Sequence, residues 1–98
     1  MIVTCTVHDR PAFLAGYAPA AAALIARFGG RYRLRAGGGL GLENVEDGAS
    51  VVISEWPDRD AALRFWNSPE YGETKRLRDG LADCRVLLVE APGLGDSA

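Results

Sequence analysis

The spacing of apolar residues changes several times along the chain, and each change predicts a new element. Residues 2–7 are rich in β-branched side chains, which predicts a strand. Apolar side chains then recur every three or four positions over residues 13–28, which predicts a helix. Pro11 suits the first turn of this helix, Pro19 predicts a kink or a later regular start, and Gly29-Gly30 predicts its end.

A hairpin is predicted in the middle of the chain. Residues 31–36 alternate strictly, which places Arg31, Arg33 and Arg35 on one face of a strand. Residues 50–56 predict the partner strand. The connection contains a glycine-rich segment at residues 37–41, but the spacing lacks the third glycine of a dinucleotide fingerprint and no Lys-Ser/Thr pair follows. We therefore expect a flexible loop there.

Two capped helices and a last strand complete the prediction. Asp58 is a good cap for a helix that reaches about Trp66. Ser68-Pro69-Glu70 predicts a second helix start, and this helix should stop at Gly80. Residues 85–90 predict the final strand. Residues 1–91 therefore form one expected domain, followed by a flexible C-terminal tail at residues 92–98.

The element order predicts the fold. Strand, helix, strand, strand, helix, strand is the ferredoxin-like βαββαβ arrangement, an α+β fold with a four-stranded antiparallel sheet and helices on one face. Strands at 2–7, 50–56 and 85–90 are apolar, or nearly so, on both faces. A bare apolar face normally marks an interface, so we expect a homodimer that packs sheet against sheet.

Composition and charge limit the classes of binding partner that we expect. The chain has 98 residues and a net charge of −2, which offers no bulk attraction for nucleic acid or for an anionic membrane. No leader and no membrane-spanning run is apparent, so the expected location is the cytoplasm. Cys5 and Cys84 form no CxxC pair, and we expect both thiols to be reduced and inert.

Several segments together resemble one protein family. Gly29-Gly30-Arg31-Tyr32 and Ser68-Pro69-Glu70-Tyr71 are the most specific, with Tyr17 and Glu55-Trp56-Pro57 in support. They resemble the domain-of-unknown-function family 1330, across nearly the whole chain. The resemblance implies the dimeric α/β-barrel superfamily, whose members include cofactor-free monooxygenases, lactone isomerases and haem-handling enzymes. The family itself has no settled activity. Arg10 stands where that family usually has an acidic cap, so Asp9 is expected to replace it.

Seven residues are candidates for a site between sheet and helices. Tyr17, Tyr71 and His8 are the candidate catalytic residues, and the candidate ligand-binding residues are Arg35, Ser68, Lys75 and Arg78. Hydroxyl and cationic donors of this kind suit a carboxylate or an enolate. Each has a simpler structural alternative. The tyrosines suit an aromatic core, Lys75 and Arg78 a solvated helix end, and Ser68 a cap. The arginines of residues 31–36 suit protection of a sheet edge, and His8 suits a polar loop.

The expected function is therefore broad. A single histidine without further ligands at suitable spacing predicts no metal site, and haem is discounted because residues 58–80 contain no histidine. We expect no cofactor and a homodimer that binds a small, partly apolar, anionic organic molecule. Two alternatives stay open: a cofactor-independent oxygenase or isomerase of small organic acids, and a structural dimer without a small ligand. Sequence alone leaves open whether the protein is an enzyme.

Overall fold

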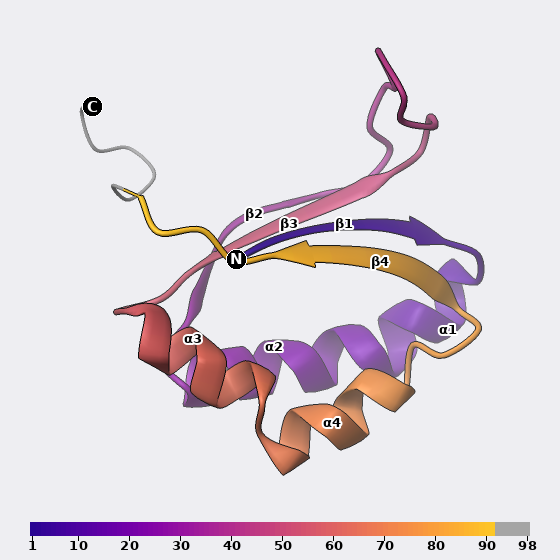
Figure 1. The fold of residues 1–98 in the computed structure, drawn as a ribbon. Coiled ribbons are helices and arrows are strands. Elements are labelled where there is room, and N and C mark those ends of the chain that lie inside the picture. Colours follow the sequence, from indigo (N-terminus) through magenta and orange to yellow (C-terminus); the bar gives the residue numbers. More distant parts are fainter. Residues whose placement is uncertain (92–98) are drawn as a thin grey trace.

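A computed structural model describes residues 1–91, and the tail predicted for residues 92–98 lies outside the described residues. The elements follow the predicted order: β1 (Ile2–Val7), α1 (Arg10–Ala15), α2 (Tyr17–Arg27), β2 (Arg31–Ala36), β3 (Ser50–Glu55), α3 (Arg59–Trp66), α4 (Pro69–Arg76) and β4 (Ala82–Leu87). The sheet order is β2-β3-β1-β4, with every neighbouring pair antiparallel. All four helices lie on one face of the sheet (Figure 1). The predicted ferredoxin-like α+β fold is confirmed.

The first helical region is divided at Gly16 rather than at Pro19. The Asp9 carboxylate caps α1 by accepting a 3.1 Å hydrogen bond from the Ala12 amide, as expected from the sequence. Gly16 ends α1 and stands before α2. Pro19 is the third residue of α2, where a backbone amide has no partner within the helix. The proline therefore removes no hydrogen bond within α2.

The alternation predicted for β2 is wrong. A register irregularity lies between Tyr32, which is paired with Ser54, and Leu34, which is paired with Ile53. A bulge of this kind adds one residue to one strand and reverses the faces that follow. The guanidinium of Arg35 consequently stacks over the ring of Tyr32, 4.4 Å from its centroid. The three arginines thus do not share a face, although β2 does lie at the sheet edge.

The last strand begins and ends earlier than predicted. It covers Ala82–Leu87 instead of residues 85–90. The partner strand explains the difference, because Val7 pairs with Ala82 and Ile2 pairs with Leu87. The apolar residues after Leu87 have almost no strand left beside them. The second predicted helix, by contrast, ends at Arg76, and tight turns with hydrogen bonds between residues three apart lead to Gly80.

An aromatic cluster joins α3 and α4 to the sheet. Phe65 is fully buried, and the rings of Tyr71 and Trp56 lie 4.4 Å and 5.0 Å from its centroid. Trp66 lies 5.4 Å from Tyr71, and Phe28 meets Phe65 edge to face at 6.1 Å. Offset and edge-to-face contacts stabilise such a core beyond the area that they bury. This cluster fills one end of the layer between helices and sheet.

The open face of the sheet is less uniformly apolar than predicted. Over β2 and β3 it carries Leu34, Ala36, Val51 and Ile53, but β1 and β4 contribute exposed Thr4, Thr6, Asp83 and Arg85. The earlier start of β4 brings Asp83 into the sheet, whereas Arg85 was already part of the predicted strand. At the end of β4 the face is apolar again, because 60% of the surface of Leu87 is exposed there. The apolar part of the face is therefore a stripe.

Candidate functional site

Two tyrosines from different helices meet beneath the sheet. Tyr17 begins α2, and Tyr71 lies in the first turn of α4 because Ser68 caps that helix and Pro69 occupies its first position. Their hydroxyl oxygens lie 2.8 Å apart, so one hydroxyl donates to the other. Tyr71 is only 3% exposed, whereas Tyr17 is half-buried. The pair is thus anchored on one side and reaches partly toward solvent on the other.

Arg78 completes this cluster. It lies in the tight turns after α4, on the same side as buried Tyr71 and Thr74, and is only 8% exposed. Its guanidinium carbon lies 5.4 Å from the ring centroid of Tyr17. The Nη1 atom is buried and has no hydrogen-bond partner within residues 1–91. A buried charged donor without a partner is costly, which makes this atom the most unusual polar feature of the layer.

The electrostatics of the cluster favour neutral hydroxyls beside one cation. Burial and the neighbouring Tyr71 raise the pKa of Tyr17 well above its ordinary value. Burial opposes the charge of Arg78, but Tyr71, Tyr17 and Cys84 more than offset it, so its pKa is raised. No carboxylate is among the groups of the described chain that shift the pKa of Arg78. At neutral pH the cluster therefore offers hydroxyl hydrogens and a guanidinium that no carboxylate of residues 1–91 neutralises.

The sheet above the cluster is not sealed. Cys5 and Cys84 face each other across β1 and β4, and Cys84 lies close enough to Arg78 for a side-chain hydrogen bond. On the same face, the side chains of Val3, Val52 and Val86 remain half-buried rather than fully buried. A small apolar group would remove these side chains from water. The layer therefore combines an apolar wall with polar donors.

The other four predicted site residues lie apart from the tyrosine pair. The Ser68 hydroxyl accepts from the Tyr71 amide at 3.1 Å and donates to the Phe65 carbonyl at 2.8 Å, so it is fully used as a cap. The Lys75 ammonium is exposed over the ring of Trp66, at 4.5 Å. Arg35 stacks on Tyr32 as described above. His8 lies at the exposed end of β1, with Nε2 2.9 Å from Asp83.

A groove that the sequence did not reveal lies at the other end of the sheet. It has a volume of about 550 Å³ and is bordered by Met1, Ile2 and Ile53, by the start of α3, and by residues 88–91. The Arg59–Glu90 ion pair, at 3.7 Å, spans two of its borders. None of the seven predicted site residues borders it. Because residues from both ends of the described chain form this groove, no local motif could have predicted it.

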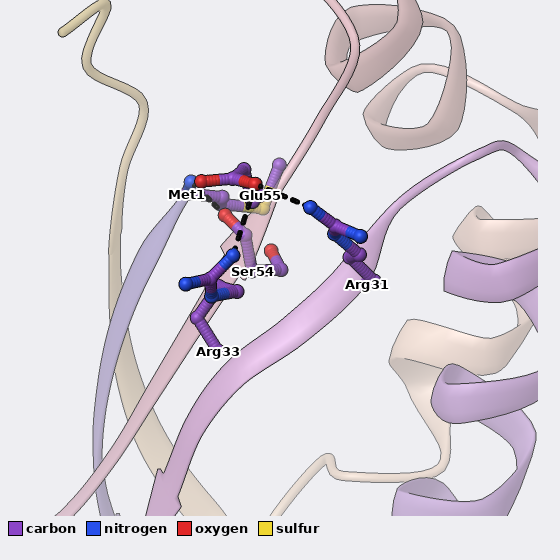
Figure 2. Close-up of polar contacts among 5 residues, drawn as sticks. All are labelled: Met1, Arg31, Arg33, Ser54 and Glu55. Atoms are coloured by element: carbon purple, nitrogen blue, oxygen red, sulfur yellow. Dashed lines mark hydrogen bonds and ion pairs between the residues drawn. The ribbon is translucent and has the colours of Figure 1, made fainter. Parts of the chain in front are cut away.

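One carboxylate organises the polar side of this groove. Figure 2 shows Arg31 and Arg33 of β2 pointing toward Glu55, with nitrogen–oxygen distances of 3.1 Å and 3.4 Å. The Met1 ammonium donates to the Ser54 carbonyl at 2.7 Å, and burial lowers its pKa. Glu55 thus pairs with both Arg31 and Arg33 and offsets part of their positive charge.

Comparisons with known proteins identify the family of this chain and a crystal structure with a similar fold. The profile of the family described as "Domain of unknown function (DUF1330)" matches residues 1–92. A search of curated proteins gave no match. The chain is similar to the crystal structure of SnoaB, a cofactor-independent oxygenase from Streptomyces nogalater, with a TM-score of 0.67 and 24% identity. The alignment covers 97% of this chain and 94% of that chain, and the likeness confirms the fold.

No helix within residues 1–91 combines the length and the apolar character that crossing a membrane requires.

Proposed function

The chain belongs to the DUF1330 family, and we propose that it is a homodimer that binds a small, partly apolar organic anion between helices and sheet. The proposal rests on one observation: the buried guanidinium of Arg78 has an unpartnered Nη1 and no carboxylate among its charged neighbours. A carboxylate or enolate would supply the missing acceptor and pair a full negative charge with the guanidinium. We further propose the cytoplasm as its location.

The tyrosine pair gives the proposed site its second contact. Tyr71 is held by Tyr17 at 2.8 Å, and Tyr17 is the more exposed of the two. A ligand oxygen beside Tyr17 would accept from a hydroxyl whose raised pKa keeps it protonated. Tyr17 therefore acts as a hydrogen-bond donor in this proposal. His8, Arg35, Ser68 and Lys75 take no part in it, because each is engaged elsewhere or lies at the surface.

The second subunit is proposed from the open face. Leu34, Ile53 and Leu87 present apolar surface there, and the exposed Leu40, Leu42 and Val45 belong to the β2–β3 loop, which extends beyond the sheet away from the helices (Figure 1). Exposed apolar side chains gathered on one face commonly mark an interface with another protein. A second copy covering it would supply the burial that a chain of about 100 residues otherwise lacks.

Paired ligands provide the test of binding. We expect small aromatic and aliphatic acids to raise the melting temperature more than the corresponding neutral amides do, because only the acids neutralise Arg78. Arg78→Met should abolish this difference, whereas Arg76→Met, which removes an exposed charge two residues away, should preserve it. Mass spectrometry of the purified protein would identify a retained ligand. If every acid behaves like its amide, the anion site is absent.

A cofactor-independent oxygenase is the second candidate function. It is favoured by the fold shared with SnoaB and by the hydroxyl donors, which suit an enolate formed on a small organic acid. Oxygen uptake without added cofactor, measured with each acid that binds, tests it. Uptake that depends on Tyr17 supports the oxygenase, and binding without uptake favours a sequestering or sensing role. No binding at all, with an intact dimer, favours the structural dimer.

A further inference from the structure

Cys5 and Cys84 are far apart in sequence but directly opposite in the sheet. β1 and β4 are antiparallel, and their register pairs Cys5 with Cys84. Residues directly opposite in such a pair have Cα atoms about 4.5 Å or 5.5 Å apart, and both values lie within the range of a disulfide. The thiols are free and close enough for a side-chain hydrogen bond. The sheet therefore holds two reduced thiols where a bond between them requires little movement.

The two thiols differ in access. Cys5 is 6% exposed on the central strand, whereas Cys84 is half-buried on the edge strand β4. A small oxidant from solvent consequently meets Cys84 first. Cys5 lies behind it, shielded from solvent and directly opposite Cys84 in the register of the two strands. This is the arrangement of an attacking thiol and a resolving thiol.

The surroundings of Cys84 favour its reactive form. The neighbouring Cys5 thiol and Arg78 lower the pKa of Cys84 to about 6, while burial and Asp83 oppose this shift. The neighbouring Cys84 and burial raise the pKa of Cys5, which therefore stays protonated. The thiolate is the nucleophilic form of cysteine, and a neighbouring arginine is a common cause of its stabilisation.

We propose that Cys5 and Cys84 are a peroxide-reactive dithiol pair that closes to a cross-strand disulfide, with Cys84 as the attacking thiol. In the first step the Cys84 sulfur attacks the terminal oxygen of a small hydroperoxide. The O–O bond breaks, an alcohol or water leaves with one proton from solvent, and Cys84 becomes a sulfenic acid. In the second step the Cys5 sulfur attacks the Cys84 sulfur, the S–O bond breaks, and the Cys5 proton leaves within water. The two thiols lose two electrons and the peroxide gains them.

Re-reduction requires an external thiol. Two equivalents of a small thiol such as glutathione would open the disulfide by exchange and leave as their own disulfide. The cycle uses neither the tyrosine hydroxyls nor a bound organic anion. It shares Arg78 with the proposed ligand site, but disulfide formation requires no bound acid, so the two proposals are tested by separate readouts.

Peptide mapping after oxidation is the direct test. The reduced protein is treated with a small excess of hydrogen peroxide, blocked with N-ethylmaleimide and digested. We expect a mass loss of two hydrogens, a linked peptide containing Cys5 and Cys84, and no maleimide adduct. Unlinked thiols that both take up maleimide, or disulfides only between separate chains, would overturn the proposal. Because this experiment uses the unmodified protein, it needs no variant that folds.

Variants separate the two steps. Cys5→Ser should stop the reaction at a sulfenic acid on Cys84, which dimedone traps, whereas Cys84→Ser should give neither dimedone adduct nor disulfide. Arg78→Met should slow oxidation at least tenfold relative to the parent protein, and Arg76→Met, on the exposed end of α4, should not. Trapping on Cys5 instead of Cys84, or equal rates for the two arginine variants, would contradict the assigned roles.

Discussion

The hydroxyl oxygens of Tyr17 and Tyr71 lie 2.8 Å apart and connect the first turn of α2 to the first turn of α4. These residues are separated by 54 positions in sequence, so the bond joins the two halves of the helical layer. It also determines where a ligand oxygen would have to lie in order to form a hydrogen bond with these hydroxyl groups. Stability and the proposed ligand binding therefore depend on the same two hydroxyl groups.

Replacing Tyr17 with phenylalanine should affect both properties. Tyr17→Phe leaves the Tyr71 hydroxyl buried without its partner, so we expect the free energy of unfolding to fall by about 1–2 kcal/mol. Affinity for the proposed acid, and any turnover, should be lost while the dimer stays intact. Urea unfolding, thermal shift and sedimentation measure the three quantities. Tyr32→Phe is the matched control, because within residues 1–91 its hydroxyl makes no hydrogen bond. Equal behaviour of the two variants would remove Tyr17 from the site.

Alkaline pH should destabilise the protein through Tyr17. Its pKa is raised in the fold, whereas an unfolded tyrosine titrates near pH 10. Above about pH 10 the unfolded chain loses this proton while the folded chain retains it. The contribution is therefore complete below pH 10 and declines by about 1 kcal/mol per pH unit above it. Urea midpoints between pH 9 and pH 11 measure the decline, and Tyr17→Phe should flatten it. An identical slope in that variant would assign the effect to other groups.

Arg78→Met should raise the stability of the protein while it lowers the affinity for organic acids. Methionine keeps the aliphatic contact with Tyr17 but removes a buried charge whose Nη1 is unpartnered. We expect the free energy of unfolding to rise by about 1 kcal/mol, as is common when a functional charge is removed. Affinity for organic acids should meanwhile fall. Chemical denaturation measures the first effect. If the free energy of unfolding instead fell by several kcal/mol, Arg78 would be a structural residue whose guanidinium has hydrogen-bond partners within the fold.

Two glycines should respond oppositely to alanine. A Cβ atom at Gly30 would lie 2.8 Å from the Trp56 ring and 2.9 Å from the Ile25 side chain, so Gly30→Ala should destabilise the fold by about 2–3 kcal/mol. At Gly72, inside α4, nothing lies within 4 Å of the added atom. Gly72→Ala should therefore stabilise the protein by about 0.5–1 kcal/mol. Thermal unfolding of both variants tests the close packing of β2 against Trp56. Equal effects would contradict it.

The proposed dimer should dissociate when the open face is charged. Leu87 is 60% exposed there, opposite Ile2, so Leu87→Asp should weaken dimerisation by at least about 100-fold, or roughly 3 kcal/mol. Leu77→Asp is the control, because Leu77 is nearly half exposed but follows α4 on the helical side. Sedimentation at several concentrations measures both variants. A parent protein that stays monomeric at high concentration would exclude the sheet-to-sheet assembly.

Most of the fold could be predicted because its signals are local. The period of apolar residues, the caps Asp9, Asp58 and Ser68, and the stop at Gly29-Gly30 each act over a few residues, and all are observed. The errors arise where pairing between strands overrides local pattern. The bulge at Arg33 and the early start of β4 at Ala82 depend on what the neighbouring strand offers. A sequence period carries no such information.

The site could be predicted only in part, for a related reason. Tyr17, Tyr71 and Arg78 were singled out by residue type, and the fold brings them together. Lys75 and Arg78 are both predicted as ligand-binding residues, but the tight turns after Arg76 turn Arg78 inward and leave Lys75 exposed. The meeting of Cys5 and Cys84 requires the register of β1 on β4. Knowledge of the fold class narrows that register but does not determine it.

The aromatic cluster around Phe65 also gives the protein a useful intrinsic tryptophan fluorescence. Both tryptophans of the chain, Trp56 and Trp66, touch this cluster, one from the end of the sheet and the other from α3. Their emission colour should shift when the helices separate from the strands. Occupation of the proposed site beside Tyr17 should change the emission of Trp66, whose ring lies 5.4 Å from that of Tyr71, without any added dye. Ligand binding and unfolding can thus both be measured by tryptophan fluorescence in the unlabelled protein.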